Sequence, residues 1–261
     1  MIGKKHFGSG SLRDALYDRF LLKREHFCNL GHRKGAAYMS TLTFLIDVDN
    51  TLIDNDDVKR DYDMHLQAEM GSALAERFWD IYEQVRKERG VVDIPLALQR
   101  FREQTSLEEL DEQTYLHVHS IFDNYPFSQA LYPYTLETLA YLRTIGLTVI
   151  VSDGDLFFQS EKIISSYLAE AVEGRVLLYV HKQEHLDEVM AMYPADHYAM
   201  IDDKPQILVD SKAIMEKRLT TVFVQQGKYA EEQPPGFMPD ISVLHFADLR
   251  SYKADQFFAT H

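Results

Sequence analysis

Two aspartates stand two residues apart in the segment Asp47-Val48-Asp49-Asn50-Thr51, directly after a run of apolar residues. Once the chain leaves a strand, both carboxylates can face one site. A carboxylate attacks phosphorus poorly unless a cation neutralises both partners, and Mg²⁺, which prefers oxygen ligands, does this. One aspartate can then form an acyl phosphate, while the other protonates the leaving oxygen and later activates water. The segment predicts phosphoryl transfer, although acid pairs that only cap helices are also common after strands.

Polar side chains also end three later apolar runs of the chain. Ser152 ends one run, where its hydroxyl can hold a phosphoryl oxygen. Lys182 ends another, where its ammonium group can neutralise the nucleophile or the phosphate. Asp202 and Asp203 end a further run and are suited to hold a metal ion. Together with Asp47, these positions favour one phosphate and Mg²⁺ site over unrelated surface groups.

The apolar runs that precede these residues have the form of buried strands. They lie at 41–49, 147–155, 176–182, 197–203 and 219–224. Helix-like stretches alternate with them, at 136–146, 159–170, 184–193 and 205–217, and Gly146 suits the left-handed position that ends the first helix. The alternation predicts an α/β fold, a Rossmann-like parallel sheet with helices on both faces. Ligands bind at the carboxyl ends of such strands, where the polar residues cluster.

The stretch 56–131 breaks this alternation, because its apolar residues recur at spacings of three and four. We expect four or five amphipathic helices, inserted after the first strand as a helical cap. The predicted domains are a basic extension at 1–40, an α/β core at 41–55 and 132–261, and the cap at 56–131. Linkers near 53–58 and 126–134 should act as hinges that close the cap over the site.

Two groups of residues in the predicted cap allow more than one interpretation. Lys59 and Arg60 begin it, and a basic residue there could meet an anionic substrate, although a solvated helix start is the simpler interpretation. Phe78, Trp79 and Tyr82 are expected in the apolar core of the cap.

In combination, the motifs resemble those of the haloacid dehalogenase (HAD) superfamily. Its four motifs are matched in order by DVDNT at 47–51, VIVS at 149–152, Lys182 and IDD at 201–203. The resemblance extends over about residues 41–245, and the insert resembles the helical cap of the C1 class. The strings VSDGDLFFQSEKI, VEGRVLLYVHK and MIDDKPQIL resemble an uncharacterised bacterial branch, which suggests no substrate.

The resemblance implies a role for each acid of the motifs. Asp47 would be the nucleophile and a Mg²⁺ ligand, and Asp49 the general acid and base, with its backbone carbonyl on the metal. Asp203 matches the usual metal-binding position. Asp202 replaces a commoner glycine, so the division of labour between these two metal-site acids stays open. Dehalogenases of the superfamily carry no acid at the position of Asp49, whereas phosphatases and phosphomutases do.

The resemblance also implies that Thr51, Ser152 and Lys182 bind the phosphate, with Thr51 ordering the first loop. The prediction is a magnesium-dependent phosphohydrolase, a phosphatase that acts on a small phosphorylated metabolite through an aspartyl-phosphate intermediate. A phosphomutase would use the same site and differ only in the acceptor of the phosphoryl group. A binding or regulatory protein that keeps the fold without turnover is the alternative outside enzymes.

Composition limits the partners and the compartment. The net charge of −14 disfavours nucleic acid, and no run of eighteen apolar residues indicates a membrane segment. Residues 1–39 alone are basic, with eight Lys and Arg against three acids, and three interpretations stay open: a tail, a docked helix or a targeting arm. A single cysteine, Cys28, allows no internal disulfide. We expect a cytoplasmic protein and leave its oligomeric state open.

Overall fold

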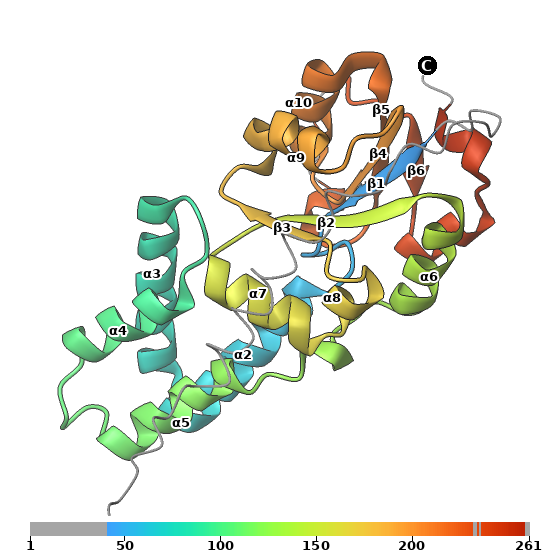
Figure 1. Cartoon of the computed structure of the whole chain (residues 1–261). Coiled ribbons are helices and arrows are strands. Elements are labelled where there is room, and N and C mark those ends of the chain that lie inside the picture. Colours follow the sequence, from blue (N-terminus) through green and yellow to red (C-terminus); the bar gives the residue numbers. More distant parts are fainter. Residues whose placement is uncertain (1–40, 232–233, 235, 259–261) are drawn as a thin grey trace, which may run out of the picture. The chain divides into compact units, whose positions relative to one another are not determined.

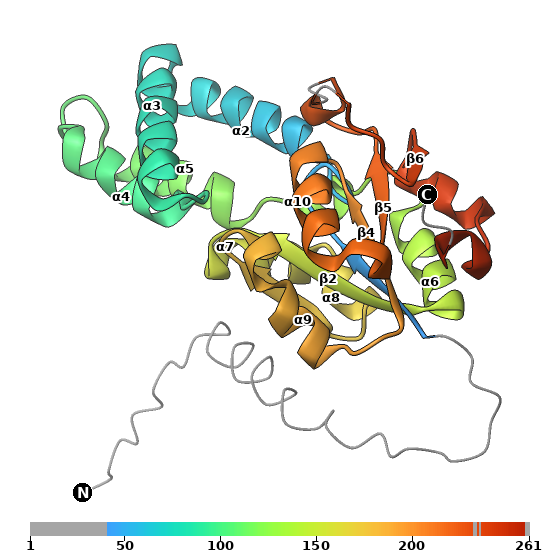
Figure 2. The ribbon, with the colours of Figure 1, turned by 90° about the horizontal axis from the view of Figure 1, so that it is seen from above.

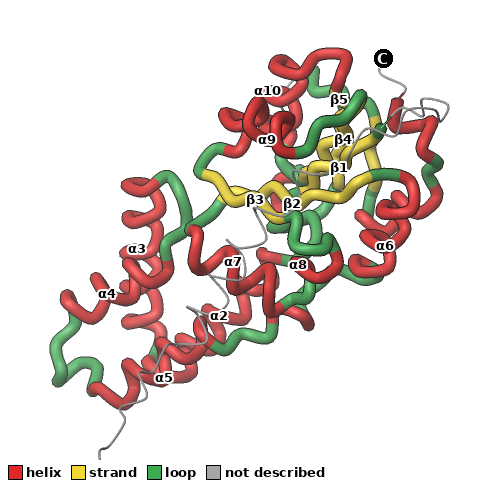
Figure 3. Tube along the Cα trace, in the orientation of Figure 1, coloured by secondary structure: helices red, strands yellow, loops and turns green. Residues whose placement is uncertain are grey.

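The central element is a six-stranded parallel sheet (Figures 1 and 3). The computed structural model describes residues 41–231, 234 and 236–258, so the extension expected at 1–40 lies outside the described residues. The spatial order of the strands is β3-β2-β1-β4-β5-β6. Their bounds are β1 Leu42–Ile46, β2 Leu147–Asp153, β3 Val176–Tyr179, β4 His197–Asp202, β5 Leu219–Val224 and β6 Ile241–Val243.

The middle of the sheet is buried throughout. Strands β1, β4 and β5 are buried along their whole lengths, as their continuous apolar sequences require. Strand β1 pairs in parallel with β2 on one side and with β4 on the other. The chain runs outward from β1 to β2 and β3, then crosses back to β4 and runs outward in the opposite direction. Such a reversal of strand order leaves a crevice at the carboxyl ends of the strands.

Helices cover both faces of the sheet. Helices α9 and α10 lie on one face, and α6, α7 and α8 lie on the other (Figures 1 and 2). Their bounds are α6 Thr135–Ile145, α7 Leu156–Ser165, α8 Leu168–Ala171, α9 Leu186–Met192 and α10 Pro205–Met215. This arrangement confirms the predicted Rossmann-like α/β fold. No helix in the described part of the chain is long and apolar enough to cross a membrane.

Local details differ from the prediction in three places. Gly146 has extended backbone with φ −171°, which any residue can adopt, so the left-handed conformation expected there was wrong. A β-carbon at Gly146 would lie 2.7 Å from the Phe44 ring and 2.8 Å from the carbonyl oxygen of Leu42, so close packing against β1 explains the glycine. The helix expected over 159–170 is two helices, with Tyr167 in a left-handed conformation between them. Strand β6 has three residues, too few for a recognisable period.

Four helices follow β1 before the chain returns to the sheet. They are α2 Asn55–Met70, α3 Ser72–Arg89, α4 Ile94–Gln104 and α5 Glu112–Asp123. In Figure 1, α3, α4 and α5 lie to one side of the sheet and do not join it. Helices α2, α4 and α5 each begin at an aspartate whose carboxylate accepts a backbone N–H of the first turn: Asp54, Asp93 and Asp111.

The chain enters and leaves this helical segment at adjacent points. Ile53 and Leu131 form an antiparallel β-bridge. Beside it, the backbone N–H of Asp54 donates to the carbonyl oxygen of Ala130 at 2.9 Å. The helical segment is therefore joined to the sheet by two linkers that are hydrogen-bonded to each other.

Candidate active site

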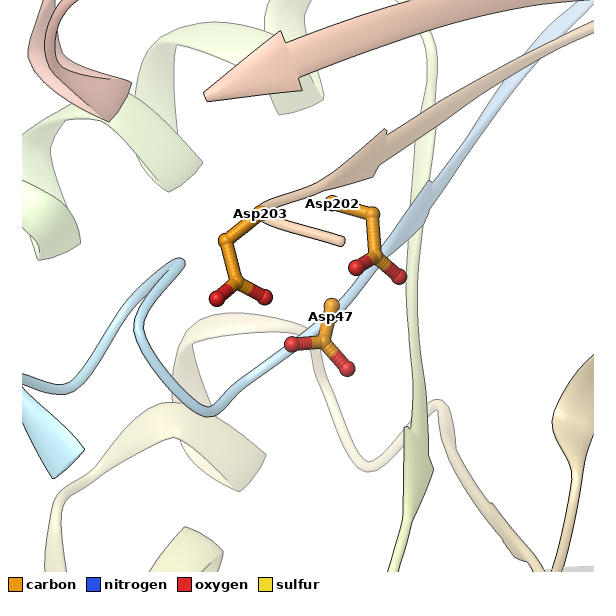
Figure 4. A group of neighbouring side chains, drawn as sticks. All are labelled: Asp47, Asp202 and Asp203. Atoms are coloured by element: carbon orange, nitrogen blue, oxygen red, sulfur yellow. The ribbon is translucent and has the colours of Figure 1, made fainter. Parts of the chain in front are cut away.

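Three carboxylates meet at the carboxyl ends of β1 and β4 (Figure 4). Asp47 follows β1, Asp202 is the last residue of β4, and Asp203 follows it. One oxygen from each of the three lies within 4.8 Å of the others, and all three residues are buried. The backbone N–H of Asp47 donates to the carbonyl oxygen of Ile201 at 3.0 Å, which fixes the end of β1 against β4. The structure thus brings together acids that are far apart in the sequence.

The loop after Asp47 is a tight turn. The carbonyl oxygen of Val48 accepts the N–H groups of Leu52 and Ile53 at 2.8 and 3.0 Å. Asn50 takes a left-handed conformation with φ 59°, which its short polar side chain tolerates. Thr51 is fully buried, and its hydroxyl has no hydrogen-bond partner in the described part of the chain. The backbone N–H of Thr51 donates to the carbonyl oxygen of Val48 at 3.3 Å, and the expected role of its side chain in ordering this loop stays a prediction.

Lys182 joins two of the carboxylates. Its ammonium nitrogen contacts Asp47 Oδ1 and lies 2.6 Å from Asp202 Oδ2, and the side chain is 1% exposed. Burial lowers the pKa of Lys182, but Asp202 and Asp47 raise it by more, so the group stays charged. Strand β3 ends at Tyr179, so Lys182 begins a short 3₁₀ helix, Lys182–His185, instead of ending the strand as the sequence suggested.

Two further polar side chains reach the site from α7, and neither belongs to the predicted motifs. The Lys162 ammonium donates to Asp49 Oδ1 at 2.7 Å and to Asn55 Oδ1 at 3.0 Å. Gln159 donates from Nε2 to the hydroxyl oxygen of Ser152 at 3.0 Å. Burial raises the pKa of Asp49, but the charge and hydrogen bond of Lys162 outweigh it, so this pKa lies below its usual value. Gln159 and Lys162 are three residues apart on the helix that follows Ser152, and this spacing was the signal available in the sequence.

A second unpredicted cation, Lys204, directly follows the acid pair. Burial lowers its pKa, but Asp47, Asp202 and Asp203 raise it by more, so the ammonium group is charged. Burial, and then the neighbouring Asp202 and Asp47, raise the pKa of Asp203 to about 9. A basic residue immediately after paired acids is visible in the sequence, but the sequence does not show which way it points.

The free oxygens of the cluster test whether a metal ion suits it. Asp47 Oδ2 and both carboxylate oxygens of Asp203 are buried and have no hydrogen-bond partner among the described residues. Buried acceptors without a donor are costly, and a hard divalent cation with oxygen ligands would satisfy them. The cluster therefore fits a divalent cation. The side chain of Asp49 is outside the cluster, and its expected contribution through the backbone carbonyl stays a prediction.

A cavity of about 430 Å³ adjoins this site. The sheet side contributes Asp49, Lys162 and Lys204 to its wall, and the helical side contributes residues of α2 and α3. Phe78 and Tyr82 are buried, as expected, and Tyr82 also lines this cavity. Trp79, expected in the apolar core as well, is only partly buried and lines the cavity.

The fold agrees with that of solved proteins. A haloacid dehalogenase-like hydrolase of Burkholderia xenovorans LB400 is 43% identical to this chain, with a TM-score of 0.73, and the match covers 83% of this chain and 100% of that one. This chain belongs to the haloacid dehalogenase-like hydrolases. No family model and no curated protein matches it.

More distant HAD-like structures share the fold. The HAD-hydrolase YfnB of Bacillus subtilis, bound to magnesium, is 14% identical with a TM-score of 0.55, and the match covers 81% of this chain and 97% of that one. The 2-haloacid dehalogenase of Pseudomonas syringae pv. Tomato DC3000 is 15% identical with a TM-score of 0.55, covering 81% and 96%. At these identities the likeness concerns the fold alone, so the reaction of this HAD-like hydrolase has to be argued from its own side chains.

Proposed function

We propose that this chain is a magnesium-dependent phosphohydrolase that acts on a small phosphorylated metabolite through an aspartyl-phosphate intermediate. The observation that carries the proposal is Asp49, a second carboxylate two residues after Asp47, held at the cavity by Lys162 at 2.7 Å. A halide departs without a proton, whereas the alcohol of a phosphate ester needs one. An acid at this position therefore supports hydrolysis of a phosphate ester over removal of a halide.

The charge of the site supports a phosphate together with a divalent cation. Four carboxylates face three ammonium groups there: Asp47, Asp49, Asp202 and Asp203 against Lys162, Lys182 and Lys204. Burial raises the pKa of Asp47 and of Asp203, which favours their protonated forms when no cation is bound. A divalent cation would keep both groups ionised and would offset the two negative charges of a phosphate dianion, because a buried uncompensated charge is costly.

Asp47 and Asp203 would hold the cation through their free oxygens, with Asp202 beside them and the carbonyl oxygen of Asp49 as a further ligand. Bound there, Mg²⁺ would neutralise the phosphoryl oxygens and the attacking carboxylate.

The side chains then divide the reaction between them. A carboxylate oxygen of Asp47 attacks phosphorus and the bond from phosphorus to the ester oxygen breaks. The negative charge of the bound phosphate would raise the pKa of Asp49 from the low value that Lys162 sets, so that Asp49 can take up a proton and donate it to the ester oxygen. Asp49 then takes a proton from water, which attacks the acyl phosphate, releases phosphate and restores Asp47. Ser152 and Lys182 orient the phosphoryl oxygens throughout, and Thr51 holds the loop.

We further infer that residues 56–131 act as a cap that closes over the site. The paired linkers at Ile53 and Leu131 support this, because they form a narrow connection about which the helices can turn. The cavity is lined from both the helices and the sheet, so its shape depends on that closure.

The direct test measures two products. We expect the purified chain with Mg²⁺ to release phosphate from p-nitrophenyl phosphate, and EDTA to stop the release. 2-Chloropropionate, assayed for chloride, should not react. Chloride release without phosphate release would overturn the proposal in favour of a dehalogenase. Transfer of the phosphoryl group to a second hydroxyl without free phosphate would indicate a phosphomutase, and binding of phosphate esters without any turnover would indicate a non-catalytic protein.

A further inference from the structure

The wall of the cavity formed by α2 and α3 is basic. The charged side chains that these two helices contribute to the wall are Lys59, Arg86 and Lys87, and none of the lining residues from α2 and α3 is an acid. The chain as a whole carries a net charge of −14, so a positively charged wall is the opposite of what the overall composition would suggest. These three cations are not needed for the proposed reaction itself, since Lys162, Lys182 and Lys204 already serve the carboxylates.

Lys59 is held in place by aromatic rings. Its ammonium nitrogen lies 5.1 Å from the centre of the Trp79 ring and 4.9 Å from that of Tyr82. Such contacts fix a cation while leaving part of its charge uncompensated. The ring faces on this side are occupied by Lys59, so they do not form an open platform for a nucleobase. The cavity wall therefore presents a fixed positive charge instead of a stacking surface.

The nearby acid does not neutralise the group. Glu83 accepts from Lys59 at 3.1 Å and pairs with Arg86 Nε at 3.1 Å, so a single carboxylate is shared between two cations. Lys87 has no ion pair within residues 41–231 and 236–258. Half-exposed pairs such as these are weak, and a ligand anion can enter beside them. A positive charge is left on this wall.

Besides Asp49, the opposite wall carries two acids, and each uses one carboxylate oxygen to accept backbone N–H groups. Asp155 accepts the N–H groups of Phe157 and Phe158 at the start of α7, and Asp153 accepts the N–H of Lys182 at 2.7 Å. These carboxylates would repel an anion. A second anionic group of a ligand would therefore lie against α2 and α3, away from Asp153 and Asp155.

We propose that the substrate is a small phosphate monoester whose alcohol portion carries a second anionic group, a carboxylate or another phosphate, bound by Lys59, Arg86 and Lys87. The inference rests on the proposed phosphohydrolase function and adds the substrate class. A guanidinium and two ammonium groups suit either anion. The cavity of about 430 Å³ suits a compact metabolite.

Matched pairs of esters test the charge alone. 3-Phosphoglycerate is compared with glycerol 3-phosphate, and fructose 1,6-bisphosphate with fructose 6-phosphate, by kcat/KM for phosphate release. We expect the more anionic member of at least one pair to be preferred by about tenfold or more, as hydrogen bonds to charged groups allow. The pair with the larger preference identifies carboxylate or phosphate. High salt should reduce the preference, because these cations are half-exposed.

The variant Arg86→Gln should reduce that preference by about tenfold, since it removes one charged donor. Arg89→Gln is the matched control: Arg89 lies three residues further along α3, is exposed and does not line the cavity, so its removal should leave the preference unchanged. Arg86 and Arg89 both complement the dipole at the end of α3, so a loss through helix stability alone would affect both variants equally.

A binding measurement separates this inference from the proposed function. Trp79 is the only tryptophan of the chain and lines the cavity, so its fluorescence reports ligand binding. In Asp47→Asn with Mg²⁺, the more anionic ester should bind at least about tenfold more tightly than its partner. Tighter binding without turnover by the unaltered chain would contradict only the phosphohydrolase function. If the chain hydrolyses both esters of each pair with nearly equal kcat/KM, and Arg86→Gln does not change that ratio, only the proposal of a second anionic group in the substrate would be overturned.

Discussion

The two walls of the active site are built in different ways. On the sheet side, the proposed reacting groups stand at strand ends: Asp47 follows β1, and Asp203 follows β4. Hydrogen bonds between strands fix these positions, so a motif in the sequence is sufficient to predict where these side chains meet. On the helical side, Lys59 and Arg86 lie on helix surfaces, and their placement depends on how α2 packs against α3. Changes on the sheet side should therefore alter the reaction, and changes on the helical side should alter the choice of substrate.

The largest effect is expected for Asp47→Asn. The amide has nearly the same size but cannot supply the attacking oxygen, so turnover should fall by at least ~10³-fold while the fold is kept. Phosphate release and circular dichroism measure the two properties. Asp210→Asn, on the outer part of α10, is the control and should retain activity. Substantial turnover by Asp47→Asn would remove the nucleophile from the proposed mechanism.

Asp49→Asn should lose less, and the loss should depend on the leaving group. General acid and base assistance is typically worth ~10²–10⁴-fold. Aryl phosphates need little protonation in the first step, whereas alkyl phosphates need much more, so single-turnover phosphoryl transfer should slow mainly for alkyl esters. Hydrolysis of the intermediate should slow for both. Equal losses in the first step would show that Asp49 is not the leaving-group acid.

Lys162→Met tests a residue that belongs to none of the four motifs. The change removes the donor to Asp49 and to Asn55 while keeping the apolar part of a side chain that is 3% exposed. Losing a hydrogen bond to a charged group costs about 1.5–3 kcal/mol, which corresponds to a roughly 10- to 100-fold fall in kcat/KM. Thermal unfolding serves as the control for a general loss of packing. An unchanged kcat/KM would mean that the sheet-side motifs act without α7.

The smallest effect on activity is expected for Gly146→Ala. Gly146 directly precedes β2 and packs against the start of β1, whereas Asp47 follows the other end of that strand. The added methyl group would meet Phe44 and the Leu42 carbonyl at under 3 Å, and overpacking of this kind typically costs about 1–3 kcal/mol of unfolding free energy. Denaturant unfolding should register that loss, with kcat/KM unchanged below the transition. A stability equal to that of the unaltered chain would show that β1 shifts freely, contrary to its role as a rigid support for Asp47.

The sequence predicted the sheet and the gathering of Asp47, Asp202 and Asp203 at its edge, because both leave local signals. The apolar runs around β1, β2 and β4 identify the strands, and strand ends in a parallel sheet share one edge, so Asp47, Ser152 and Asp203 could be placed together. Lys162 was missed because its direction depends on where α7 begins. The cap at Asp155 starts that helix three residues earlier than the apolar pattern suggested.

The helical segment was predicted in kind but not in detail. Periodicity identifies an amphipathic helix, yet the rim of its apolar face can turn either into a core or toward a cavity. Trp79 lies on that rim and lines the cavity, whereas Phe78 and Tyr82 are buried as expected. Which of these outcomes occurs is decided by contacts with α2, which sequence spacing does not report.

The bridge between Ile53 and Leu131 has a consequence for how this architecture can diversify. Because the two ends of the helical segment are neighbours, the whole segment is connected to the sheet in the same way as a single surface loop. Such a loop can be shortened, lengthened or replaced by an unrelated one at little cost in chain-closure entropy, and the register of β1 against β4 is unaffected. A graft of a foreign helical segment between these two residues is therefore a practical way to give the same reacting acids a new range of substrates.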